Sequence, residues 1–151
     1  TAAPGVIWCQ RCGVCLLYNG SSDIMEKTRL ALLETLFAAF NAHDADAVMA
    51  CFAPAIVFDA AAGPEAVGKR ITGLDAVRAA FVGTWTSMPD VQWQVRRHAV
   101  FADRAVTEWL FTATAPAGGR IEVEGVDLFG FEGELIVSKS AFRKDRPLQG
   151  V

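Results

Sequence analysis

The chain has 151 residues, of which 52% are hydrophobic, and carries a formal net charge of −3 at pH 7. This length fits one domain with a sizeable core, and no apolar run reaches the length of a membrane span. Basic residues are scattered along the chain, so we expect no nucleic-acid partner and no membrane partner.

Residues 1–24 differ from the rest and are predicted to form an N-terminal arm. The arm is apolar without a helical period, and the run 19–22 (Asn-Gly-Ser-Ser) interrupts it near its end. We expect such an arm to pack on the domain or on a partner subunit. It shows no basic segment followed by a long apolar stretch, so we expect no signal peptide and a cytoplasmic location.

Three of the four cysteines lie in this arm. Cys9, Cys12 and Cys15 have the spacing C-x2-C-x2-C, which occurs in metal and iron–sulfur sites. Such a site needs a fourth ligand, which only Cys51 or a histidine would supply from afar. We therefore expect reduced, semi-buried thiols and no metal.

The first half of the chain after the arm is predicted to be mainly helical. Leu30, Leu33, Phe37 and Phe40 form one stripe at helical spacing, which predicts a helix over 24–43. Asp44 is placed to cap a second, short helix. The remaining elements are that short helix over 45–52, strands over 55–59 and 67–72, and a third helix over 73–85.

After Asp90 the hydrophobic period changes from helical spacing to alternation, which predicts a meander of antiparallel strands. In the first of them, Trp93, Val95, Ala99 and Phe101 share one face and His98 lies on the more polar face. The strands are predicted over 91–101, 105–114, 120–131 and 135–143. The result is an α+β plan in which helices cover one face of the sheet, within a single domain over 25–147 and a tail over 148–151.

Asp127 lies on an apolar face of the third of these strands. It shares the odd-numbered face with Val123, Phe129 and Phe131. A carboxylate in that position loses hydration, which is costly unless the group is protonated, paired or hydrogen-bonded. The pattern leaves two interpretations open: a buried aspartate satisfied by neighbouring donors, or a residue kept for its chemistry.

Four segments together resemble the nuclear transport factor 2-like superfamily, which includes ketosteroid isomerase and the SnoaL-like polyketide cyclases. They are residues 37–59, 71–81, 125–131 and 136–142, and the resemblance covers residues 27–144. The resemblance implies a cone-shaped, curved antiparallel sheet wrapped around three helices, the cystatin-like or ketosteroid isomerase-like roll. It also implies a pocket inside the cone, and homodimers are common in the superfamily.

Two residues fall at positions that matter in ketosteroid isomerases. By the resemblance, Asp59 stands where the proton-transferring base is kept, and Asp127 where a carboxylic acid donates a hydrogen bond to the developing oxyanion. Different burial of the two carboxyls would separate their pKa values and assign these roles. The position of the family's oxyanion tyrosine corresponds approximately to Leu36 in this sequence. The absence of a tyrosine there weighs against steroid isomerase activity.

The pocket of this cone is predicted to be lined mainly by aromatic and hydroxyl side chains. Ser138 and Ser140 are expected on the inward face of the last strand, together with Ile136. Their hydroxyls would orient a ligand or bond to the backbone. The full predicted lining is Leu36, Phe40, Trp109, Phe111, Phe129, Ser138, Ser140 and Phe142.

Three functions fit this sequence. The first is a cofactor-independent acid–base enzyme of the isomerase, cyclase or hydrolase type, which acts on a small apolar molecule through Asp127 and Asp59. The second is a pocket that binds such a ligand without changing it. The third is a protein-interaction module. No phosphate loop, nucleophile elbow or histidine-rich motif is present, so we expect no cofactor.

Overall fold

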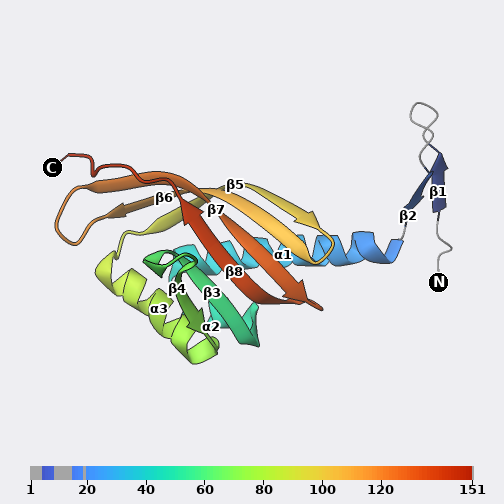
Figure 1. Cartoon of the computed structure of the whole chain (residues 1–151), viewed down its shortest axis with the longest axis horizontal. Coiled ribbons are helices and arrows are strands. Elements are labelled where there is room, and N and C mark those ends of the chain that lie inside the picture. Colours follow the sequence, from blue (N-terminus) through green and yellow to red (C-terminus); the bar gives the residue numbers. More distant parts are fainter. Residues whose placement is uncertain (1–4, 9–14, 19, 151) are drawn as a thin grey trace.

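The computed structural model describes residues 5–8, 15–18 and 20–150, with side chains from residue 22 onward. It confirms the α+β class: a curved, unclosed six-stranded sheet carries the helices on one side (Figure 1). The elements are β1 (Gly5–Trp8), β2 (Cys15–Tyr18), α1 (Gly20–Ala42), α2 (Ala45–Ala50), β3 (Phe52–Glu65), β4 (Gly68–Thr72), α3 (Leu74–Ser87), β5 (Gln92–Phe101), β6 (Arg104–Thr114), β7 (Arg120–Glu132) and β8 (Leu135–Arg143).

The six-stranded sheet has the order β4-β3-β8-β7-β6-β5, and β3 pairs with β8 in parallel while all other neighbours are antiparallel. Strands β5 to β8 are the predicted meander. Strands β1 and β2 pair with each other in a separate two-stranded sheet beyond the start of α1 (Figure 1). Packing of the arm on the domain or on a partner remains a prediction, and Cys9 and Cys12 lie outside the described residues.

Helix α1 begins at Gly20, four residues before the predicted start, and packs along β5. Leu30, predicted to open the buried stripe, is 36% exposed, whereas Arg29 is buried. The Arg29 guanidinium donates hydrogen bonds to the backbone carbonyls of Ala102 and Gly133, and so ties the helix to two hairpin turns. The apolar residues that face the sheet are Leu33, Leu36, Phe37 and Phe40.

Asp44 caps α2 as predicted, since its carboxylate accepts a hydrogen bond from the Ala47 backbone N–H at 3.0 Å. His43, which precedes it, is partly buried. Its ring stacks on Trp85 with centroids 5.3 Å apart, and its Nε2 lies 3.2 Å from the Val91 carbonyl oxygen. The residues that join α1 to α2 are therefore held against α3 and against Val91, which precedes β5. No helix of the described residues is long and apolar enough to cross a membrane.

A β-bulge in β8 decides which of its side chains face the helices. Gly130 pairs with Ser138 and Phe131 pairs with Ile136, so Val137 is an extra residue without a partner. Because side chains alternate along a strand, one extra residue exchanges the two faces beyond it. Ile136 and Lys139 are consequently both buried on the helix-covered side.

A second bulge in β5 has the same effect at Arg96. Val95 pairs with Trp109 and Arg97 pairs with Glu108, so the alternation shifts between them. His98 then faces the helices, where its Nδ1 lies 2.8 Å from the Thr107 hydroxyl. The sequence predicted that Ala99 and Phe101 face the core and that His98 faces away from it. The bulge reverses this assignment, so the prediction was wrong.

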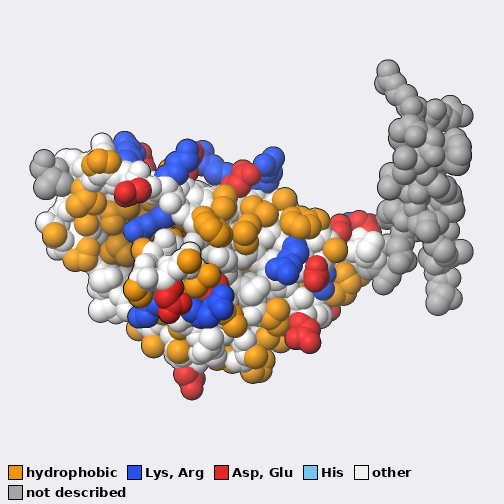
Figure 2. All heavy atoms as spheres, in the orientation of Figure 1, with side chains coloured by type: hydrophobic (Ala, Val, Ile, Leu, Met, Phe, Trp, Pro, Cys, Tyr) orange, Lys and Arg blue, Asp and Glu red, His pale blue; other side chains and the backbone are white. Residues whose placement is uncertain are grey.

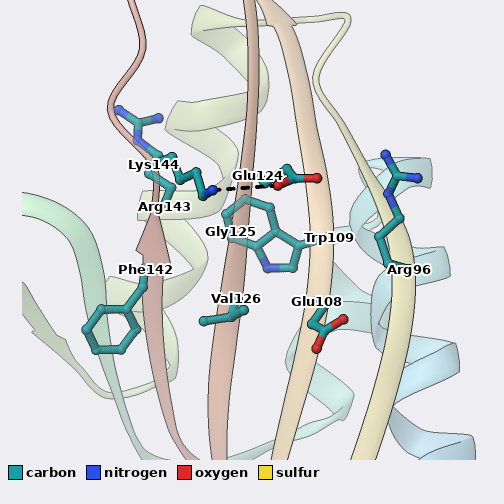
Figure 3. A pocket seen from close by; sticks show the side chains of 9 residues that line it. All are labelled: Arg96, Glu108, Trp109, Glu124, Gly125, Val126, Phe142, Arg143 and Lys144. Carbon is teal, nitrogen blue, oxygen red and sulfur yellow. Dashed lines mark ion pairs between the residues drawn. The ribbon is translucent and has the colours of Figure 1, made fainter.

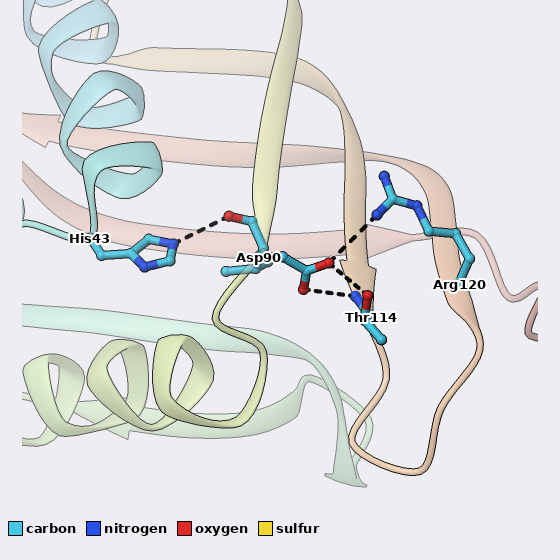
Figure 4. Close-up of polar contacts among 5 residues, drawn as sticks. His43, Asp90, Thr114 and Arg120 are labelled. Atoms are coloured by element: carbon cyan, nitrogen blue, oxygen red, sulfur yellow. Dashed lines mark hydrogen bonds and ion pairs between the residues drawn. The ribbon is translucent and has the colours of Figure 1, made fainter.

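The sheet is secured at one end by a polar cluster around Asp90. Its carboxylate accepts hydrogen bonds from the Thr114 backbone N–H at 2.9 Å and from the Thr114 hydroxyl at 2.7 Å (Figure 4). The Arg120 guanidinium forms an ion pair with it, in which Nη1 lies 3.6 Å from Asp90 Oδ2. These contacts, the hydrogen bonds of Thr114 above all, hold the pKa of Asp90 below its usual value. They fasten the entry of β5 to the end of β6.

Candidate functional site

A cavity of about 450 Å³ lies between α3, the β3–β4 hairpin and the helix-covered face of β6, β7 and β8. We call it the central cavity. Lys69 and Arg143, which are exposed, also line it. Most of its buried wall is aromatic, formed by Phe58, Phe81, Trp93, Trp109 and Phe111. Such a surface fits a small apolar molecule.

Asp127 supplies the buried carboxylate of this cavity. It points to the helix-covered side of β7, as the alternation predicted, and is 1% exposed. Its Oδ1 accepts a hydrogen bond from Lys139 Nζ at 2.7 Å, whereas its Oδ2 is buried without a hydrogen-bond partner. Burial raises the pKa of the Asp127 carboxyl, and the Lys139 charge opposes that rise. Asp127 is thus a residue of the cavity lining whose carboxylate has one oxygen without a hydrogen-bond partner.

Lys139 is the partner that the sequence did not predict. Its side chain is 4% exposed and its Nζ lies among the rings of four phenylalanines. The nearest is Phe58, with the Nζ 4.7 Å from the ring centroid, and the others are at 5.9 to 6.0 Å. Ring faces stabilise a nearby cation, which offsets part of the cost of burying the ammonium group.

Trp109 stands beside this pair and depends on Gly125 of the neighbouring strand. A Cβ atom on Gly125 would lie 2.3 Å from the Trp109 ring, so only glycine leaves room for the indole there. The Trp109 Nε1 is buried without a hydrogen-bond partner. The indole lies near enough to Asp127 to favour its carboxylate form and lower its pKa, although no hydrogen bond of ordinary geometry joins the two. The cavity wall thus carries an unused donor and an unused acceptor.

Asp59 is not part of the central cavity. Its neighbours Phe58 and Ala60 line the cavity, and alternate residues of a strand point to opposite faces. The Asp59 carboxylate instead forms two hydrogen bonds of 2.8 Å with Arg70, the residue opposite it on β4. The hydrogen bonds from Arg70 lower the pKa of Asp59. Of the two predicted catalytic carboxylates, the structure brings only Asp127 to the cavity.

The bulge at Val137 also explains three predicted lining residues that do not face the cavity. Ser138 and Ser140 are half-buried on the side of β8 opposite Lys139, and Phe142 is 54% exposed on that same outer side. The expectation that Phe142 faces inward was wrong. Trp109 and Phe111 line the cavity, while Leu36, Phe40 and Phe129 belong to the packed core beside it.

Four residues that line the cavity were not predicted from the sequence: Lys139, Trp93, Phe58 and Phe81. The sequence predicted the strands and the helix to which the aromatic residues belong. It could not predict that these side chains surround one lysine, because that depends on tertiary packing. Lysine is seldom buried, so a strand with one lysine is normally oriented with that lysine toward solvent. The one available signal was that the other orientation of β8 places a cation close to Asp127.

A second hollow, which we call the outer groove, lies on the opposite face of the sheet and measures about 410 Å³ (Figure 3). Charged residues of both signs line it, among them Arg96 and Glu108, and the apolar side chains of Val126 and Phe142 line it on the neighbouring strands β7 and β8. Lys144 Nζ lies 3.9 Å from Glu124 there. Figure 2 shows basic and acidic side chains interspersed along the sheet edge of the domain. This mixed surface differs from the aromatic central cavity.

Comparison with known proteins gives one family and many structures. The model of the SnoaL-like domain matches residues 33–139, and no curated protein matches. Bal32a, from a soil-derived mobile gene cassette, is similar at 17% identity with a TM-score of 0.72, over 80% of this chain and 92% of that one. A protein described as a SnoaL-like polyketide cyclase from Jannaschia sp. CCS1 has 17% identity and a TM-score of 0.70, over 80% and 88%.

A third similar structure is a protein with a ketosteroid isomerase-like fold from Catenulispora acidiphila, solved with trimethylamine. It has 17% identity and a TM-score of 0.66, and the match covers 74% of this chain and 83% of that one. At these identities the similarity to solved structures shows the fold alone. The family match and these structures confirm the resemblance predicted from the sequence.

Proposed function

The chain belongs to the SnoaL-like domain family, and we propose that it binds a small, mostly apolar molecule in the central cavity and transfers a proton there through Asp127 and Lys139. The observation that carries this proposal is that Asp127 lines an aromatic cavity and has a buried carboxylate oxygen, Oδ2, without a hydrogen-bond partner. A polar atom of the ligand would complete the bonding of that oxygen.

The pair shares one proton, which resides on Nζ in the ionised form or on the carboxyl in the neutral form. In the ionised form Oδ2 accepts a proton from an acidic C–H next to a ligand carbonyl. In the neutral form the carboxyl group donates a hydrogen bond to the ligand oxygen. The raised pKa of Asp127 brings these two forms closer in free energy, which suits a group that both takes and returns a proton.

The test uses 2-tetralone, a small aromatic ketone with acidic protons beside its carbonyl. Exchange of those protons for deuterium is followed by NMR in D₂O with and without the full chain. We expect the protein to accelerate exchange, and Asp127→Asn to reduce the acceleration by about 100-fold or more, as for loss of a general base. Asp59→Asn is the matched control and should change it by less than about twofold, because its partner is Arg70 outside the cavity. Equal exchange by wild type and Asp127→Asn would refute the assignment.

A binding protein without catalysis is the second candidate. It is favoured by one observation: among the described residues, Asp127 is the only acidic residue that lines the central cavity, because Asp59 lies elsewhere. In that case 2-tetralone would quench tryptophan fluorescence through Trp93 and Trp109 without any acceleration of exchange. If the protein shows neither quenching nor accelerated exchange, both candidates are refuted for this class of ligand.

The proposal also includes a cytoplasmic homodimer formed through the outer face of the sheet. Phe101, Leu128 and Phe142 are exposed there by 42% to 54%. The outer groove carries charges of both signs, so a second copy placed on it by a two-fold axis would bring side chains of both signs to the interface. Sedimentation of wild type and Phe142→Glu tests this: we expect a dimer that the charge dissociates, and a wild-type monomer at micromolar concentration would contradict it.

A further inference from the structure

We propose that Lys139 forms an imine with an aldehyde or ketone group of a ligand in the central cavity. This inference rests on the proposed function, because it requires the same cavity to accept a carbonyl compound. It goes further by giving Lys139 a covalent role and by fixing the ligand class.

The position of Lys139 is the first argument. It is the one lysine of the described residues whose side chain is buried, and it lines the central cavity. Lys27 and Lys144 are 75% and 76% exposed, and Lys69 is exposed at the cavity edge. A desolvated amine next to an apolar cavity is the arrangement that activates a lysine toward carbonyl carbon.

Asp127 supplies the proton transfers that the reaction needs. Across the 2.7 Å contact, Oδ1 takes a proton from Nζ and leaves a free amine. The amine forms a bond to the carbonyl carbon, and the resulting carbinolamine loses its hydroxyl group as water after the Asp127 carboxyl protonates it. The net change is one C=N bond formed, one C=O bond broken and one water released.

The surroundings also stabilise the product. The protonated imine is a cation at the place that Lys139 Nζ occupies, where Phe58, Phe40, Phe81 and Phe129 present their rings. The Asp127 carboxylate is its counter-ion. An imine in water hydrolyses readily, and an aromatic wall around the C=N bond limits the access of water.

The test uses 2-naphthaldehyde with sodium cyanoborohydride, which reduces an imine to a stable amine. This aldehyde has no proton on the carbon beside its carbonyl, so it forms an imine without undergoing the exchange reaction proposed above. After incubation of the full chain, peptide mass spectrometry locates the naphthylmethyl group. We expect Lys139 to be modified at least about tenfold faster than Lys27 and Lys144 in the same molecule, because it lines the cavity that would hold the aldehyde and has Asp127 beside it for the proton transfers.

Lys139→Arg should abolish the fast modification, and Lys144→Arg, an exposed lysine, is the matched control that should retain it. If Lys139→Arg does not fold, the comparison among lysines within the wild-type chain still decides the question. Modification of exposed lysines alone, while the aldehyde quenches tryptophan fluorescence, would overturn the imine and leave the proposed function standing. Absence of quenching together with absence of 2-tetralone exchange would overturn both.

Discussion

Replacing Lys139 with methionine tests whether the buried ion pair is held together by its charges. Methionine keeps an unbranched apolar stem of similar length, so the main loss is the ammonium group at 2.7 Å from Asp127. Asp127 is 1% exposed and has no second hydrogen-bond partner, so its carboxylate would remain buried and unpaired. Removing one member of a buried pair costs about 3–5 kcal/mol.

The double variant Asp127→Leu/Lys139→Met separates the cost of an orphaned charge from the value of the pair. Replacing both members with apolar side chains removes the desolvation cost of two ions, so we expect a free energy of unfolding within about 1 kcal/mol of wild type, or higher. The single variant should instead lose about 4 kcal/mol, which corresponds to about a thousandfold in the unfolding equilibrium constant.

The dependence on pH gives a second readout in the single variant. Burial raises the pKa of Asp127 above its unfolded value, so its contribution to stability is complete below the unfolded pKa and is lost as the pH rises through the folded pKa. Without Lys139, no positive charge of comparable strength among the described residues opposes the rise in the pKa of Asp127. The deficit of Lys139→Met should therefore be largest near neutral pH and shrink as the pH falls toward about 4.

Urea unfolding, monitored by circular dichroism between pH 4.5 and 7.5, measures these differences in the free energy of unfolding. The slope of the free energy of unfolding against urea concentration should be the same in all variants. An equal slope shows that unfolding exposes the same amount of surface in each of them. A double variant less stable than Lys139→Met, or a deficit that does not vary with pH, would refute the reasoning.

Three further changes test the surroundings of the site. Gly125→Ala forces a Cβ atom against both the Trp109 ring and the backbone carbonyl oxygen of Phe142, so we expect a loss of about 1–3 kcal/mol in urea unfolding. No loss would show that the ring and the β8 backbone both move aside freely. Arg29→Lys removes the forked hydrogen bonds to two hairpin carbonyls and should cost about 1–3 kcal/mol; an unchanged thermal midpoint would contradict this. Asp90→Asn should lower the melting temperature at neutral pH, because the depressed pKa of Asp90 means that its contribution is present above the unfolded pKa and lost as the pH falls through the folded one. That difference should vanish in acid, and a difference of the same size at every pH would argue against the Thr114 contacts as its cause.

The fold was predictable because its signals are local and repeated. Helical spacing in α1, the capping residue Asp44 and the change to alternation after Asp90 each specify one element, and their order resembles one superfamily. Burial of Asp127 followed from the same alternation, because no irregularity intervenes in β7 between Arg120 and Gly130. Position and burial could thus be predicted, whereas the bonding partner could not.

The errors have a common physical cause in the two bulges. In β8, unbroken alternation from Ile136 would place Ser138, Ser140 and Phe142 inward, which is what the sequence analysis predicted. In β5 the same logic placed Ala99 on the wrong face. A bulge is set by the fit of the whole strand to its neighbours, and the residues Val137 and Arg96 carry no mark of it.

Asp59 was misassigned for a different reason. Its strand β3 extends over Phe52–Glu65, well beyond the predicted 55–59, and forms a hairpin with β4 in which Asp59 stands opposite Arg70. A cross-strand pair of opposite charge satisfies the carboxylate on the outer side. The family position alone did not reveal that Phe58, its neighbour in sequence, is the residue that lines the cavity.

The bulge at Val137 decides which chemical groups of β8 line the interior. If Val137 were instead an ordinary member of the ladder while the β7–β8 turn kept its pairing, every later side chain of the strand would change sides. The amine would be presented to water, and two hydroxyls with a phenyl ring would take its place. Removing Val137 altogether would have no such effect, because Ser138 and Lys139 would then follow Ile136 in the pairing they already have. The way in which one residue is accommodated thus selects between a charged interior and a neutral one without altering any of the residues involved.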